Sequence, residues 1–147
     1  MNPNYFQIAA TKTTEPQAIE LLMELKQLAQ ELSASEMKFP ERINANKARR
    51  SEKPTKLSRS DAALLKNLEQ DMIDLEHQLC EDFSKMDTLS EIIWSLYNGF
   101  TEDINNSNKM LKHYHPDDLP LGEEMIGLKL KLNDTMASFL KLYPNET

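Results

Sequence analysis

The spacing of the leucines constrains the fold of this chain more than any other feature of its sequence. One run advances by four, three and four residues through Leu21, Leu25, Leu28 and Leu32. A second run advances by three and four residues through Leu65, Leu68, Met72, Leu75 and Leu79. Steps of three and four residues place side chains on one face of an α-helix. The chain contains no valine, a residue that favours pleated sheets, so the sequence predicts an all-α fold.

Capping signals and prolines divide the chain into four predicted helices, which we expect to form an antiparallel bundle of three to four helices. The first helix is predicted over residues 15–35, with Pro16 in its first turn, where a missing N–H is harmless. Residues 61–147 are predicted to form the rest of the bundle, with helices over about 61–85, 88–104 and 121–143. Thr88 and Glu91 form a capping box that predicts the start of the third helix.

The spacing of the apolar residues predicts which face of the third and of the fourth helix is buried. The third helix has Leu89, Ile92, Ile93, Leu96, Tyr97, Phe100 and Ile104 on one side. The fourth has Leu121, Met125, Leu128, Leu132, Met136, Phe139 and Tyr143. Two glycines in the fourth helix each cost about 1 kcal/mol of helix stability. A strand there would need a partner strand, which the sequence does not offer, so helix is predicted.

Two segments lie outside the predicted helices. Residues 1–14 are largely polar and are predicted to form a flexible N-terminal arm. Residues 36–60 contain Pro40, Pro54 and few large apolar side chains. They carry eight basic and three acidic residues, although the whole chain has a net charge of −7. As a whole this segment is predicted to be a long flexible basic loop between the first and second helices, with a short helical turn over residues 41–50 as an alternative for part of it.

The composition limits the compartment and the size of the protein. A chain of 147 residues is long enough for one domain. It has no apolar run that could span a membrane, and its N-terminus does not resemble a secretory signal peptide. The single Cys80 allows no internal disulfide and suits a reducing compartment. We therefore expect a cytoplasmic protein.

The only close cluster of metal-ligand residue types consists of His113, His115, Asp117 and Asp118. The two histidines would diverge on a helix, and no further ligands follow at a recognised spacing. A helix end followed by an aspartate cap explains the cluster more simply. A di-iron site is rejected because Asp74 and His77 provide only one imperfect copy of its motif. The sequence therefore predicts no enzyme, no catalytic residue, no metal and no cofactor.

The basic segment has three interpretations. Its positive residues are Lys38, Arg42, Lys47, Arg49, Arg50, Lys53, Lys56 and Arg59. They form a solvated linker, a patch for an acidic protein surface (including the acidic residues 61–82 of this chain), or a site for nucleic acid or an anionic membrane. Their irregular spacing and the single aromatic among them, Phe39, make nucleic acid the weakest of the three.

The amphipathic helices favour a non-catalytic protein–protein interaction module, such as a small acidic adaptor, chaperone or inhibitor. The candidate contact residues are Leu21, Leu25, Leu28, Leu32, Trp94 and Tyr97. The alternative is a nucleic-acid or regulatory factor that uses residues 38–59, and a metal-dependent enzyme ranks third. If the first helix is left free, its leucines predict a homodimer. If it docks on its own bundle, they predict a monomer.

Overall fold

Four α-helices and one 3₁₀ turn make up the described part of the chain, residues 4–53 and 86–144 of a computed structural model. The helices are α1 (Asn4–Thr11), α2 (Pro16–Arg49), α4 (Met86–Met110) and α5 (Leu119–Leu142), and the turn is η1 (Leu111–His113). No strand occurs in these ranges, which confirms the predicted all-α bundle. The helix predicted over 61–85, its leucine run and Cys80 lie outside the described residues.

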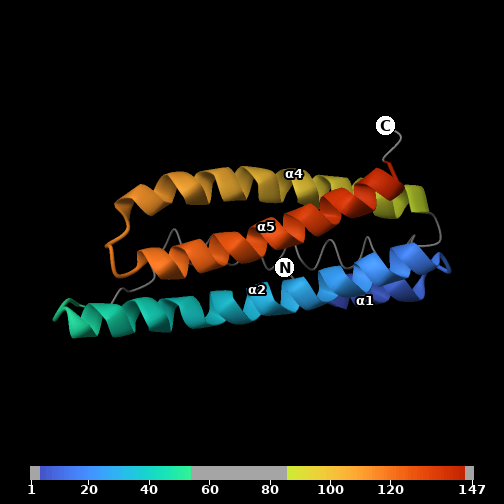
Figure 1. Cartoon of the computed structure of the whole chain (residues 1–147). Helices are drawn as coiled ribbons and strands as arrows, with labels where there is room; N and C mark the ends of the chain where they lie inside the picture. The colour runs from blue at the N-terminus through green and yellow to red at the C-terminus, as the bar shows by residue number, and fades with distance from the viewer. Residues whose placement is uncertain (1–3, 54–85, 145–147) are drawn as a thin grey trace.

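The central helix of the bundle is α5, which lies between α2 and α4 and packs against both (Figure 1). It runs antiparallel to both, so α2 and α4 point in the same direction. On one side the Ser35 hydroxyl of α2 donates to Met125 Sδ at 3.1 Å. On the other side the Asn133 amide donates to the Thr101 hydroxyl of α4 at 3.1 Å. Because α5 is central, it contributes buried side chains in two directions.

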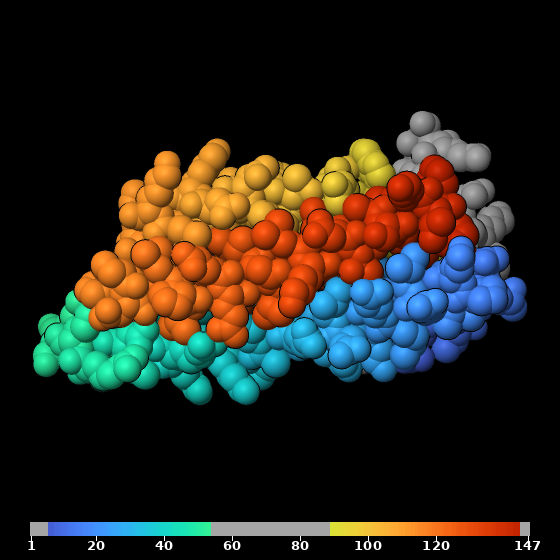
Figure 2. Space-filling model, in the orientation of Figure 1, coloured from blue at the N-terminus to red at the C-terminus, as the bar shows by residue number. Residues whose placement is uncertain are grey.

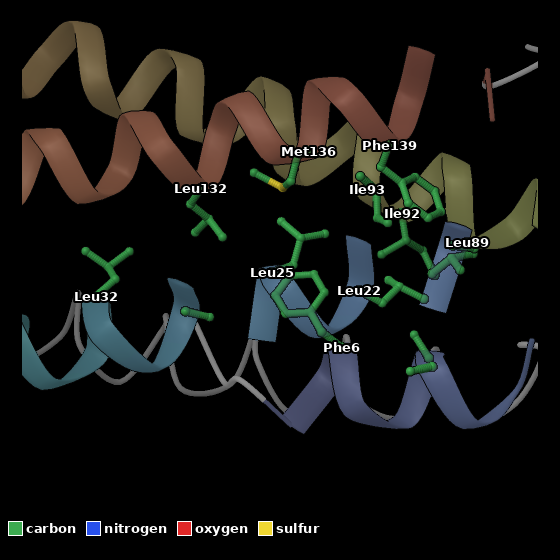
Figure 3. Packing of buried hydrophobic residues seen from close by; sticks show 14 residues of the cluster. Phe6, Leu22, Leu25, Leu32, Leu89, Ile92, Ile93, Leu132, Met136 and Phe139 are labelled. Atoms are coloured by element: carbon green, nitrogen blue, oxygen red, sulfur yellow. The ribbon is translucent and has the colours of Figure 1, made fainter. Parts of the chain in front are cut away.

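The core is formed by side chains from all four helices, as Figure 3 shows. It includes Phe6, Leu22, Leu25, Leu32, Leu89, Ile92, Ile93, Leu132, Met136 and Phe139. The predicted apolar faces of α4 and α5 both point into the bundle, with Ile126 as an additional buried residue of α5. Burying each of these large apolar side chains stabilises the folded state by about 1.5–3 kcal/mol, because it removes apolar surface from water. Over the described ranges, no helix has the length and apolarity needed to cross a bilayer.

The N-terminal residues differ from the predicted flexible arm. Residues 4–11 form α1, and Phe6, Ala9 and Ala10 are buried against the bundle. Lys26 of α2 donates to the Gln7 side chain at 2.8 Å and fixes the two helices together. The prediction of a loose arm was wrong here because the segment is too short to stabilise a helix alone and gains its stability from packing.

The first predicted helix is much longer than expected, because α2 continues through Pro40 to Arg49. The prediction of a flexible loop from residue 36 was therefore wrong for residues 36–49. Proline removes one backbone N–H, which leaves the carbonyl of Glu36 without its helical donor. Both Glu36 and Pro40 are exposed, so water can hydrate that carbonyl. Contacts to α5 and to Tyr114 then hold the helix on both sides of the proline.

The helical spacing in α2 predicts an apolar stripe that is widened on one side, and the structure buries most of it. The stripe consists of Ala18, Leu21, Leu25, Leu28 and Leu32, and the widening residues are Leu22 and Ala29. The fully buried residues are Ala18, Leu22, Leu25, Ala29 and Leu32. Leu21 and Leu28 are only partly buried at the edge of the core. Leu22 and Ala29, on the widened side of the stripe, are thus more deeply buried than Leu21 and Leu28.

Gly122 of α5 lies in close contact with side chains of the turn that precedes the helix. A Cβ atom at this position would lie 2.6 Å from Leu111 Cδ2 and 2.8 Å from Tyr114 Cε2. We expect Gly122→Ala to lower the free energy of unfolding by about 1–2 kcal/mol, because these side chains must move. Urea denaturation followed by circular dichroism measures the change.

Gly127 in the same helix is the matched control. A Cβ atom there would meet no heavy atom within 4 Å. Gly127→Ala should therefore stabilise the protein by up to about 1 kcal/mol through helix propensity alone. Equal stabilisation by both substitutions would contradict the proposed close packing at Gly122.

Candidate partner-binding cleft

A shallow apolar cleft lies between α4 and α5, near the C-terminal end of α5. It has a volume of about 390 Å³. Its lining residues are Trp94, Tyr97, Ala137, Leu140, Lys141 and Pro144. A cleft of this size accepts one or two large apolar side chains, and Lys141 adds a positive charge beside it.

The cleft is the open half of the seam along which α4 and α5 pack. In the other half, Lys129 forms an ion pair with Asp103 at 2.7 Å. One turn further along α5, the Asn133 amide donates to the Thr101 hydroxyl. Beyond these polar contacts the seam becomes apolar, and no polar pair from the described residues crosses it there. The half that contains the cleft is therefore free to accept an apolar group from outside.

Trp94 is the most unusual residue of the cleft. It is the only tryptophan of the chain, and 48% of its surface is exposed. Large aromatic side chains normally bury most of their area, and tryptophans are enriched at the centres of protein interfaces. Tyr97, one turn further along α4, is only partly exposed and packs against the core. The structure thus brings together the two aromatic residues that the sequence singles out.

The four candidate leucines lie on α2, and the structure separates them from this cleft. Leu25 and Leu32 are almost completely buried in the core and present no surface to a partner. Leu21 and Leu28 pack against the core edge and are partly exposed. Because α2 is docked on α5, the premise of a free first helix does not hold. A role of these leucines in binding stays a prediction.

Four residues of the cleft are not indicated by the sequence, namely Ala137, Leu140, Lys141 and Pro144. Leu140 looks like part of the core face of α5, and Ala137 is too small to attract attention. Only the antiparallel packing of α4 on α5 places them beside Trp94. Lys141, Leu142 and Pro144 are all exposed, so the end of α5 is not fully covered.

Two arginines of the basic segment, Arg42 and Arg50, are paired with acids of the same chain. Arg42 forms an ion pair with Glu124 at 2.8 Å. Arg50 contacts Glu52, Asp117 and Asp118 at distances between 3.3 and 3.6 Å. Arg49 donates a hydrogen bond to Asn46. Lys38 and Lys53 are exposed, Lys47 has an interaction partner, and Lys56 and Arg59 lie outside the described residues.

Asp118 is the centre of this polar contact between α2 and α5. Only 8% of its side chain is exposed. Its Oδ1 accepts a hydrogen bond from the Asn46 amide at 2.9 Å, and its Oδ2 lies 3.3 Å from Arg50 Nη2. Burial alone would raise the pKa of Asp118. The hydrogen bonds from Asn46 and Arg50 and the charge of Arg50 outweigh that effect, so the pKa is lowered from its ordinary value.

The histidine cluster forms part of the same corner. His113 ends η1 and is exposed, while His115 Nδ1 accepts a hydrogen bond from the backbone N–H of Asp117 at 3.1 Å. Asp118 occupies the N-cap position of α5, as the simpler explanation predicted, but its carboxylate makes no capping hydrogen bond. Among the described residues, no three histidine, cysteine or acidic side chains converge as a metal site.

Comparison of the chain with family models, curated proteins and solved structures finds no match.

Proposed function

We propose that this chain is a non-catalytic protein-interaction module that binds an apolar segment of a partner protein in the cleft between α4 and α5. The observation that supports this proposal is the position of Trp94, a half-exposed tryptophan at the edge of an apolar cleft. Covering an aromatic side chain of this kind removes up to about 150–250 Å² of surface from water. Adaptor, chaperone and inhibitor are all versions of this function.

The alternative function, nucleic-acid binding through residues 38–59, has less support. Arg42 and Arg50 already neutralise carboxylates of the same chain. Binding to phosphates requires arginines and lysines that can replace counterions, and a paired arginine would first have to give up its carboxylate. The net charge of −7 also repels a polyanion.

Photo-cross-linking from the cleft tests the proposed function. With p-benzoylphenylalanine in place of Trp94 in the full chain, we expect adducts with a protein in living cells, because the photoreactive ring faces the bound segment. The same group in place of Asn106, an exposed residue of α4 distant from the cleft, is the control. Mass spectrometry identifies the adducts. Absence of any protein adduct specific to position 94 would contradict the proposal.

A further inference from the structure

The described side chains that line the cleft offer hydrogen-bond donors and almost no acceptors. The indole N–H of Trp94 and the ammonium group of Lys141 only donate, and the Tyr97 hydroxyl can do both. Within the described part of the chain, no hydrogen bond or ion pair occupies these three groups. The remaining side chains of the lining are apolar, namely Ala137, Leu140 and Pro144. A ligand that matches this cleft therefore supplies acceptors.

An ordinary peptide segment meets this requirement poorly. Each of its residues carries one backbone N–H group, which needs an acceptor when it is buried. In the cleft such a group would face donors and apolar side chains. Proline has a carbonyl oxygen and no N–H, so a proline-rich segment brings acceptors without backbone donors. The lining thus favours a proline-rich segment over other extended peptides.

The length of the cleft matches one turn of a polyproline II helix. Residues 137–144 extend about 10 Å along α5. A polyproline II helix rises about 3.1 Å per residue and has three residues per turn, so one turn is about 9 Å long. Its carbonyl groups make no internal hydrogen bonds and are free to accept from the cleft. Figure 2 shows the end of α5 (red) beside the first turns of α4 (yellow) at the surface of the molecule.

Trp94 and Tyr97 provide flat surfaces against which proline rings can pack. They are three residues apart on α4, so their side chains lie on the same face of the helix. Trp94 is 48% exposed, and Pro144 adds a third ring to the lining. Aromatic-lined grooves bind proline-rich segments well, because these segments are extended before binding and lose little conformational entropy.

An amphipathic helix, the other common apolar ligand, fits this cleft less well. A helix is about 10–12 Å across and usually about three turns long. Laid along the seam, it would continue onto the polar half, where Lys129 pairs with Asp103 and Asn133 donates to Thr101. Only the part inside the cleft would gain apolar contacts. The short cleft therefore favours the thinner extended segment.

The charge of Lys141 specifies an acidic residue in the ligand. Among the described residues that line the cleft, none is acidic. Lys141 is exposed and has no ion-pair partner in the described part of the chain. Complementary charges at the rim of an interface select the partner and speed its association. An aspartate or glutamate beside the prolines supplies the matching charge.

We infer that the segment bound at the cleft is a proline-rich stretch in the polyproline II conformation, with an acidic residue beside its prolines. This inference rests on the function proposed above, and it names the chemical class of the partner.

Selection from a random peptide library displayed on phage tests this class, with the purified full chain as the bait. We expect the enriched peptides to combine several prolines with a neighbouring aspartate or glutamate. The most enriched peptide without tryptophan is then synthesised with a fluorescent label, and its anisotropy gives the affinity. With the unlabelled peptide, the emission of Trp94, the only tryptophan of the chain, should shift to shorter wavelength as the ring is covered.

Substitutions in the cleft test its donors one by one, with circular dichroism as the check that each variant folds. Trp94→Ala should weaken peptide binding at least about tenfold, as expected for a tryptophan at the centre of an interface. Trp94→Phe keeps an aromatic ring but removes the N–H donor, and should weaken binding about two- to tenfold. Lys141→Glu should weaken binding of the acidic peptide and strengthen binding of the same peptide with lysine in place of its acidic residue.

Lys131→Glu is the matched control for the change in charge. Lys131 is an exposed residue of the same helix that does not line the cleft, so binding should stay unchanged. The inference is overturned if the enriched peptides lack prolines or if no peptide is enriched. Undiminished binding to both Trp94→Phe and Lys141→Glu overturns it as well, because a site that selects acceptors must lose affinity with its donors.

The two proposals can fail separately. If proline-free peptides are enriched and lose their affinity for Trp94→Ala, the proposed function stands and only the proline-rich class is rejected. The same holds if position 94 cross-links in cells to a protein segment without prolines. If no enriched peptide depends on Trp94 and position 94 cross-links to nothing, both proposals fail.

Discussion

Phe139→Ala should lower the free energy of unfolding by about 3–5 kcal/mol, the largest effect expected of any single substitution proposed for this chain. Phe139 is completely buried, lies in the cluster shared by all four described helices, and has Tyr143 as a ring neighbour at 5.0 Å. Because α5 is central to the bundle, the cavity left by the ring would be surrounded on several sides by other helices. Urea denaturation followed by circular dichroism gives the free energy.

Leu142 provides the matched control on the same helix. It lies three residues further on and is 50% exposed. Leu142→Ala should change the free energy of unfolding by no more than about 0.5 kcal/mol. A loss below about 1 kcal/mol for Phe139→Ala would mean that the packing of α5 between α2 and α4 is wrong.

Asp118→Ala should cost about 2–3 kcal/mol at neutral pH, because it removes a buried carboxylate that accepts hydrogen bonds from Asn46 and Arg50. The Asn46 amide would keep only its hydrogen bond to the Asp117 carbonyl, at 3.2 Å. The neighbouring Asp117, whose side chain is 58% exposed, is the control. Asp117→Ala should cost less than about 1 kcal/mol.

The contribution of Asp118 should also depend on pH in a defined direction. Its pKa is lower in the folded state than its ordinary value of 3.8. The carboxylate therefore stabilises the fold fully above that value, and the contribution is lost as the pH falls through the lowered pKa. The difference in unfolding free energy between wild type and Asp118→Ala should shrink below pH 3.8. A difference that stays constant on acidification would contradict the hydrogen-bonded carboxylate.

The sequence predicts α4 and α5 best, because the spacing of their own apolar residues is enough to define both helices. The apolar residues of α4 and α5 follow helical spacing without interruption, so both the helices and their buried faces are confirmed. Proline normally ends a helix, so Pro40 predicts a break that the structure does not have. The helix α2 tolerates Pro40 because contacts on either side hold it against the rest of the bundle. Arg42 pairs with Glu124 and Phe39 packs near Tyr114, and both contacts join residues more than seventy positions apart. Local spacing contains no information on such contacts.

The residues of the candidate cleft are likewise only partly indicated by the sequence. The sequence indicates Trp94 and Tyr97, because large aromatic residues near an apolar face are frequent interface residues. It does not indicate Leu140 or Lys141, since these become part of the cleft only when α5 packs antiparallel on α4. The leucines of α2 illustrate the same limit, because an apolar stripe looks the same whether it is covered by the chain itself or by another molecule.

The amino-acid sequence by itself determined that this chain forms helices and which side of α4 and α5 is apolar, because that periodicity reflects the 3.6-residue turn of the backbone. The tertiary structure alone decided how far α2 extends, which residues neutralise its arginines and where an apolar cleft remains open. These features depend on which helices become neighbours. Burial and ion pairing are properties of two surfaces in contact, and a single helix specifies only one of them.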